Sequence, residues 1–267
     1  MSARACAFRF ATSTLAVCAV LAARPALAAG PALAAQAAQA AQAPQPPQTA
    51  QATAPIDLTG YWVAVISEDW RWRMITPAKG DFPSVPMTAE GFTLANAWDP
   101  AKDEASGEQC RSYGAPGLMR GPIRLRISWL DANTLKVETD YGMQTRLFHF
   151  GNWTPPAGPP TWQGNSVAKW NVPAGAAPAG APKAGSLTLT TDHLRAGYLR
   201  KNGVPYSANA LLNEFWDHAE QDGTRWIVIT SIVHDPKYLL VPFTTSLQFK
   251  KEADGAKWDP TPCSARW

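Results

Sequence analysis

The feature that most restricts the fold is a series of short segments rich in Trp, Val, Ile, Thr and Phe, separated by residues typical of turns. β-branched and aromatic side chains favour strands. The predicted strands are 60–74, 123–130, 134–140, 144–151, 166–171, 186–191, 210–218, 225–234 and 244–251. Tight loops at 131–133 and 221–223 join neighbouring strands, which predicts antiparallel pairing. The expected fold is all-β: an antiparallel meander forming a closed or nearly closed β-barrel, with one short helix at 88–98.

The N-terminus has the order of a secretory signal peptide. Arg4 and Arg9 precede an apolar run at 10–23 and an Ala-Leu-Ala site at 26–28. The run is too short to span a membrane, so we expect cleavage of residues 1–28 and no stable membrane insertion. Cys18 stands in a faint lipoprotein box, and its lipidation remains an alternative. The predicted location is periplasmic or secreted.

The remaining chain divides into a linker and one folded domain. Residues 29–55 are nearly all Ala, Gln and Pro, a composition that cannot bury enough side chain to offset the entropy of ordering. We therefore expect a disordered linker followed by a single domain at 56–267. Pro/Gly-rich segments near 154–160 and 173–184 break the strand pattern and are interpreted as surface insertions.

The charge balance argues against polyanionic partners. Arg4, Arg9 and Arg24 are the only charged residues before Asp57, which leaves 21 basic and 21 acidic residues in the rest of the chain. A balanced domain has no long-range field to attract nucleic acid or an anionic membrane surface. The expected partner is a small, largely uncharged apolar or aromatic molecule.

Two cysteines remain after the signal peptide, Cys110 and Cys263. In an oxidising compartment they most simply form a disulfide. The alternative, a metal or redox site, lacks the CxxC or Cys/His spacing that it needs. We expect no metal and no cofactor, and the sequence has no GxSxG motif, HExxH motif or Gly-rich phosphate loop.

The first predicted strand suggests a candidate site. If 60–74 is extended throughout, Trp62, Glu68, Trp70 and Trp72 lie on one face. A carboxylate among indole rings loses hydration, which raises its pKa towards the range of acid/base catalysis. The alternative is that Glu68 lies at the mouth of the strand and pairs with an arginine.

Other candidates lie on later segments. His149 is a possible pocket wall or a structural histidine, and Arg146 a possible interior clamp for an anion or a carboxylate. The polar segment 197–207 offers further contacts, although its Asn202-Gly203 is equally a plain turn. The predicted catalytic residues are Glu68, His149, Arg146 and Tyr206, and the predicted ligand-binding residues are Trp62, Trp70, Trp72, Arg200, Ser207 and Glu214.

Several segments together resemble a large family of secreted bacterial proteins. They are a WxGxSVxxW block at 162–170, a strand at 185–191, Tyr206-Ser207, Glu214-Phe215 and the 235–242 corner. The resemblance covers 87–250 and implies a β-rich fold, but no catalytic residue. Gly60-Tyr61-Trp62 also resembles the G-x-W opening of lipocalin-type barrels, which implies a barrel that holds one small ligand.

Three functions follow as hypotheses. The first is binding of a small apolar or aromatic molecule in a Trp-lined cavity. The second is a cofactor-free acid/base enzyme of lyase, dehydratase or isomerase type that uses the same cavity. The third is a structural or assembly factor of the cell envelope. The sequence does not decide whether the protein is an enzyme.

Overall fold

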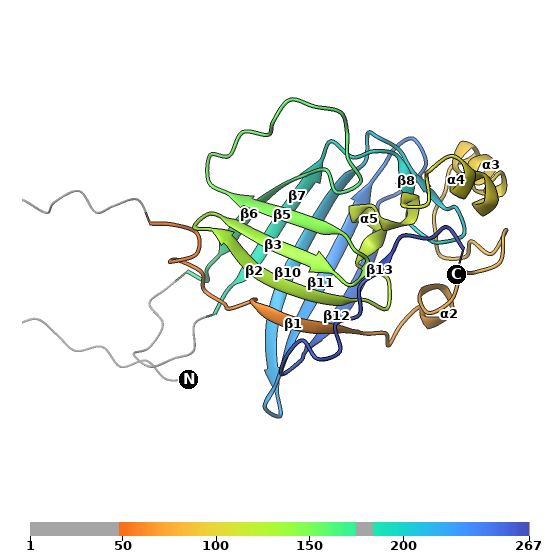
Figure 1. Ribbon diagram of the computed structural model, residues 1–267. Helices are drawn as coiled ribbons and strands as arrows, with labels where there is room; N and C mark the ends of the chain where they lie inside the picture. Colours follow the sequence, from red (N-terminus) through yellow and green to blue (C-terminus); the bar gives the residue numbers. More distant parts are fainter. Residues whose placement is uncertain (1–47, 175–183, 267) are drawn as a thin grey trace, which may run out of the picture. The chain divides into compact units, whose positions relative to one another are not determined.

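The structure is a computed structural model that describes residues 48–174 and 184–266 (Figure 1). The predicted signal peptide, Cys18, the linker up to residue 47 and the 175–183 part of the second insertion lie outside the described residues. The chain divides into two units, and the fold below is that of the unit from Pro47 onward. In the part of the chain that is described, no helix is long and apolar enough to cross a membrane.

Nine strands close into a β-barrel, which confirms the predicted all-β class (Figure 1). Each strand pairs with the next barrel strand in the sequence, and the last pairs with the first to close the ring. The barrel strands are β1 Gly60–Val65, β2 Arg124–Asp131, β3 Thr134–Thr139, β5 Thr145–Phe150, β6 Asn165–Asn171, β7 Ser186–Asp192, β10 Leu211–Gln221, β11 Thr224–His234 and β12 Phe243–Lys251. All predicted strands except the first match these bounds to within a few residues.

One neighbouring pair, β5 and β6, is parallel, which is an exception within the predicted antiparallel meander. A closed ring of antiparallel neighbours needs an even number of strands, because strand direction must alternate around it. Nine strands therefore require at least one parallel pair. The 14 residues between Phe150 and Asn165 bring the chain back along the barrel, which fits the dozen or more that a parallel connection needs. The Pro/Gly-rich segment 154–160 belongs to this return connection.

Side chains fill the barrel interior. Inward and outward residues alternate along the strands, and Glu214 and Trp216 of β10 are both buried inside. The Trp62 indole N–H donates to the carbonyl of Leu58 at 2.9 Å. The Phe148 ring meets Trp216 edge-on, with 5.3 Å between the ring centres. The middle of the barrel is thus a packed core, as is usual for barrels of about this strand number.

Residues 48–56 cover one end of the barrel. The Ala50 N–H donates to the side-chain oxygen of Asn133 (2.8 Å), and the Ala50 carbonyl accepts from the Trp170 indole (2.9 Å). Ala50 and Ile56 are buried in the barrel core. The prediction of a disordered linker as far as residue 55 is therefore wrong for its last residues, because these contacts order them.

Short helices gather at the other end of the barrel (Figure 1). They are α2 Trp70–Arg73, α3 Ala89–Asn96, α4 Pro100–Ala105, the 3-10 helix η1 Arg111–Tyr113 and α5 Ala115–Leu118. The predicted helix at 88–98 corresponds to α3, and the Thr88 hydroxyl caps it by accepting from the Gly91 N–H.

Two small sheets and a disulfide complete the helix-covered end. β8 Gly197–Tyr198 pairs with β9 Pro205–Tyr206, and β4 Tyr141–Gly142 pairs with β13 Thr261–Pro262. Cys110 and Cys263 form the predicted disulfide, with their Cα atoms 5.2 Å apart. The C-terminal segment is thereby attached to the same end of the barrel as the helices.

Candidate functional site

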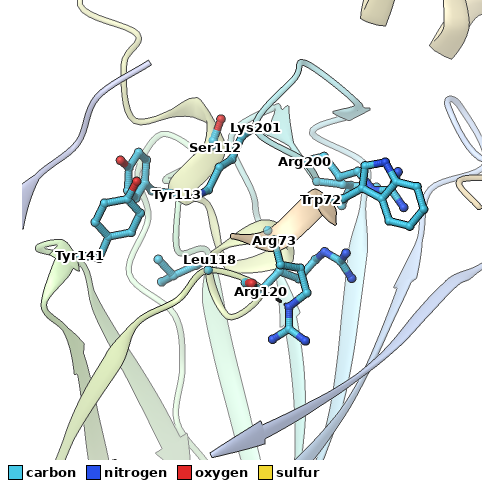
Figure 2. A pocket seen from close by; sticks show the side chains of 12 residues that line it. Trp72, Arg73, Ser112, Tyr113, Leu118, Arg120, Tyr141, Arg200 and Lys201 are labelled. Carbon is cyan, nitrogen blue, oxygen red and sulfur yellow. Dashed lines mark hydrogen bonds between the residues drawn. The ribbon is translucent and has the colours of Figure 1, made fainter. Parts of the chain in front are cut away.

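A pocket opens at the helix-covered end of the barrel (Figure 2). Trp72 and Arg73 come from α2, Arg120 follows α5, and Arg200 and Lys201 lie in the turn between β8 and β9. We call this site the arginine pocket. Its other lining residues are Ser112, Tyr113, Gly117, Leu118, Gly121, Tyr141 and Leu199.

Arg73 is the most enclosed cation of the pocket, with 1% of the residue exposed. Its Nε donates to the Arg120 carbonyl (2.9 Å) and its Nη1 donates to the Glu68 carboxylate (2.6 Å). Its Nη2 has no hydrogen-bond partner among the described residues. Burial, followed by the positive charge of Arg120, lowers the pKa of Arg73 to about 10.

The other two arginines are also buried. Arg120 donates to the Asp69 carboxylate at 3.1 Å, and its guanidinium lies 5.4 Å from the centre of the Phe243 ring. Arg200 donates from Nη1 to the Pro83 carbonyl (2.8 Å), while its Nε and Nη2 have no partner in the described chain. Burial and the nearby charge of Arg120 lower the pKa of Arg200 to about 10.

Positive charge exceeds negative charge in the arginine pocket. Glu68 pairs with Arg73 and Asp69 pairs with Arg120, but among the described residues no carboxylate forms a salt bridge with Arg200. A buried N–H group of a charged side chain that lacks a partner costs about 1–3 kcal/mol or more. An anion beside Arg200 and Arg73 would accept from these donors, so the site is suited to a negatively charged group.

Aromatic rings form the walls of the pocket. The guanidinium of Arg200 lies 4.9 Å from the centre of the Trp72 ring, and that of Arg71 lies 5.0 Å from it. On the other side in Figure 2, the rings of Tyr113 and Tyr141 lie 5.4 Å apart. The pocket therefore combines guanidinium donors with flat, mostly apolar surfaces.

The pocket is narrow. Its cavity has a volume of about 20 Å³, within a recess of about 370 Å³ that includes open solvent. A volume of this size holds about one water molecule. As it stands, the site fits one small polar group, such as a carboxylate, with any larger body in the open part.

The tryptophan row predicted for 60–74 is wrong, because β1 ends at Val65. Asp69 has a φ of 53°, in the left-handed region, which ends the extended chain before α2 begins. As a result Trp62 is buried in the barrel, whereas Trp70 is 65% exposed beside the mouth. Of the three predicted tryptophans, only Trp72 lines the arginine pocket.

Glu68 lies after the end of β1, with 41% of its side chain exposed. It accepts from Arg73 and from the Ser67 hydroxyl, which is 2.6 Å away. The expectation that Glu68 lies among indole rings is wrong, and the alternative pairing with an arginine is confirmed. The same contact orients Arg73 at the pocket.

Strand β5 places its two candidates on opposite sides of the barrel wall. His149 faces outwards and stacks on Trp153, with 3.8 Å between ring centres. It lies near the barrel end that residues 48–56 cover, whereas Glu68 lies at the helix-covered end, so these two groups cannot act together. The prediction that His149 helps to form a pocket with Glu68 is wrong.

Arg146 faces the barrel interior and forms the clamp expected for it. Its Nη1 donates to one oxygen of Glu214 at 3.0 Å, and its Nη2 donates to the other oxygen. Both side chains are almost fully buried, and the guanidinium also lies 4.9 Å from the centre of the Phe148 ring. The structure thus brings together two predicted site residues, but as an ion pair inside the core.

Tyr206 and Ser207 lie within the packed part of the protein and do not line the arginine pocket. Tyr206 is fully buried in an apolar cluster, and burial raises its pKa. The Ser207 hydroxyl donates to the Asp235 carboxylate at 2.8 Å, and the Ser207 N–H donates to the same carboxylate. Of the three residues predicted from segment 197–207 to contact a ligand, only Arg200 lines the arginine pocket.

Sequence reasoning missed Arg73, Arg120, Lys201 and Tyr141 as site residues. They come from four segments that meet only in the folded barrel. The Trp-Arg-Trp-Arg sequence of α2 is the one part of the sequence that could have indicated the arginine pocket. It places cations and indole rings together directly after two carboxylates. Its alternation instead indicated a strand.

Neither a protein-family model, nor a curated protein, nor a solved structure matches this chain. The resemblance to secreted bacterial proteins and the lipocalin-like opening therefore stay predictions. Within residues 48–174 and 184–266, no cluster of three or more His, Cys, Asp or Glu side chains could hold a metal ion.

Proposed function

We propose that this protein is an exported binding protein that holds a small organic anion in the arginine pocket. The anion is a carboxylate with a short or flat apolar body. Its charged group accepts from Arg73 and Arg200, and its body lies in the open part of the pocket. The observation that carries the proposal is the set of buried guanidinium N–H groups on Arg73 and Arg200 that have no partner among the described residues.

The proposal changes the expected partner from an uncharged molecule to an anion. Equal numbers of acidic and basic residues exclude a strong overall field, but they do not exclude a local excess of positive charge. Such an excess is found among Arg73, Arg120 and Arg200. A periplasmic or secreted location remains part of the proposal, and the Cys110–Cys263 disulfide supports an oxidising compartment.

Calorimetric titration of the exported protein tests this function. Propanoate and benzoate are compared with propanamide and benzamide, which have nearly the same shape without the charge. We expect the acids to bind at least about tenfold more tightly than the amides, because a charged hydrogen bond to a buried site contributes about 1.5–3 kcal/mol.

Two variants assign that binding to the pocket. Arg200→Met should weaken acid binding at least tenfold. The control is Arg126→Met, because Arg126 is 41% exposed and donates from two nitrogens to Glu138, away from the pocket. Equal binding of acids and amides, or equal loss in both variants, would overturn the proposed function.

A further inference from the structure

Trp72 brings a further hydrogen-bond donor to the arginine pocket. It belongs to α2 and lines the pocket, and its indole nitrogen is buried without a hydrogen-bond partner among the described residues. The indole N–H group can only donate. A buried donor that stays unpaired costs free energy, so an acceptor beside Trp72 would stabilise the protein.

Two arginines hold the indole ring of Trp72 in place. The guanidinium of Arg200 lies 4.9 Å from the centre of this ring, and that of Arg71 lies 5.0 Å from it. Arg200 donates to the Pro83 carbonyl at 2.8 Å, and Arg71 donates to the Asp81 carboxylate at 2.6 Å. Both cations are thus anchored to one short loop, which restricts rotation of the ring and preorganises its N–H group.

The unpaired donors of Arg200 lie beside this indole. Nε and Nη2 share one edge of the guanidinium, and neither has a partner in the described chain. Two parallel N–H groups of this kind match the two oxygens of a carboxylate. Trp72 and Arg200 lie on the same side of the pocket in Figure 2, and the 4.9 Å between guanidinium and ring centre allows one oxyanion to accept from both side chains.

The pocket offers donors and no free acceptor. Among the lining residues, every buried side-chain polar atom that lacks a partner in the described chain is a donor nitrogen: Nε1 of Trp72, Nη2 of Arg73, and Nε and Nη2 of Arg200. An ionised carboxylate has about four lone-pair sites and no hydrogen of its own. It therefore fits this set of donors better than an amide, an alcohol or a protonated acid, each of which brings a hydrogen that needs an acceptor.

Resting on the proposed function, we propose that the indole N–H of Trp72 binds the anion directly, together with Nε and Nη2 of Arg200. Trp72 is then a ligand-binding residue with a polar role, and not only part of an aromatic wall. The ligand it favours is an oxyanion whose head group is fully ionised. A neutral donor adds affinity for such a group without adding further positive charge to the pocket.

Calorimetric titration with benzoate compares Trp72→Phe with Trp70→Phe. Phenylalanine keeps an aromatic ring at position 72 but has no N–H group. Trp70 lies in the same helical turn, is 65% exposed and does not line the pocket, so it provides a matched control. We expect Trp72→Phe to weaken benzoate binding at least about tenfold, as the loss of a hydrogen bond to a charged group predicts, and Trp70→Phe to change it less than about twofold.

Nuclear magnetic resonance of the unmodified protein needs no variant to fold. We expect benzoate to move the indole N–H proton signal of Trp72 downfield, because a new hydrogen bond to a carboxylate deshields this proton. The indole nitrogen of Trp216 is also buried and unpaired among the described residues, but it lies in the barrel core, so its signal should stay in place. A Trp72 signal that does not move while benzoate binds would overturn the inference.

The variants separate this inference from the proposed function. If Arg200→Met weakens benzoate binding but Trp72→Phe binds benzoate as tightly as Trp70→Phe does, the role of Trp72 is wrong and the binding function stands. If the unmodified protein does not bind benzoate at all, the binding function itself fails, and the inference fails with it.

Discussion

The Arg146–Glu214 pair shows how strongly a single side chain inside the barrel can affect the stability of the fold. Its two side chains are 0% and 1% exposed. Glu214→Gln leaves a buried guanidinium without its carboxylate, and we expect it to lower the free energy of unfolding by about 3–5 kcal/mol. Urea denaturation measures the loss.

A double variant separates the lost charge balance from lost packing. Arg146→Met with Glu214→Leu removes both charges and keeps most of the volume. It should recover most of the stability lost by Glu214→Gln, since replacing a buried ion pair by apolar side chains is often neutral. A double variant that is no more stable than the single one would show that the pair is not what stabilises this part of the core.

Lys201 should make stability depend on pH. Its pKa is about 8 in the folded protein and near 10.5 when unfolded, so the unfolded state binds more protons between these values. Stability relative to Lys201→Met should therefore be lowest below pH 8 and should rise by about 1–2 kcal/mol as the pH approaches 10.5, after allowance for partial solvent screening. Urea denaturation of both proteins at pH 7 and pH 10 measures this, and a constant difference would contradict it.

At the scale of the elements, the return connection between β5 and β6 is required by strand parity. Deleting 154–160 leaves seven of the 14 residues, too few to run back comfortably beside the barrel. We expect this deletion to destabilise or unfold the protein. Thermal unfolding followed by circular dichroism measures the effect.

Segment 176–182 provides a matched deletion of the same length and a similar Pro/Gly/Ala-rich composition. It lies between β6 and β7, which are antiparallel and need only a short turn. Its removal should leave the melting temperature nearly unchanged. If both deletions have the same effect, the argument from parity is wrong.

The elements also explain which predictions from the sequence succeeded. Buried residues alternate with exposed or half-buried ones from Leu211 to Asp217 of β10 and from Trp226 to His234 of β11, so the pattern alone identifies these strands. The Asp222-Gly223 pair also predicted its hairpin correctly. Asp and Gly tolerate positive φ, and both residues have positive φ in the structure. The first strand was predicted too long because Trp-Arg-Trp-Arg alternates like a strand. In the structure this segment is one helical turn, next to the ion pairs Arg73–Glu68 and Arg120–Asp69.

At the scale of the whole molecule, the disulfide connects segments 153 residues apart. Replacing Cys110 and Cys263 by Ser should lower the free energy of unfolding by about 2–5 kcal/mol, because the unfolded chain gains conformational freedom. Urea denaturation of the double variant measures the loss. The reduced unmodified protein serves as the comparison, and unchanged stability in both would show that the disulfide does not stabilise the fold.

The arginine pocket is also a property of the whole molecule. Cys110 and Cys263 could be paired from composition alone, since only two cysteines remained. Arg73, Arg120 and Arg200 carry no such pairing signal, and they meet only because the barrel brings α2, the end of α5 and the β8–β9 turn to one mouth. The periodicity of the sequence therefore predicted the barrel fold but could not predict the arginine pocket.

A crystal structure of the protein grown with benzoate is the most direct measurement of the arginine pocket as an anion site. The account predicts benzoate with its carboxylate oxygens about 2.7–3.2 Å from Nη2 of Arg73 or from Nε and Nη2 of Arg200. Benzoate bound elsewhere, or a pocket in which ordered water alone satisfies these N–H groups, would contradict it.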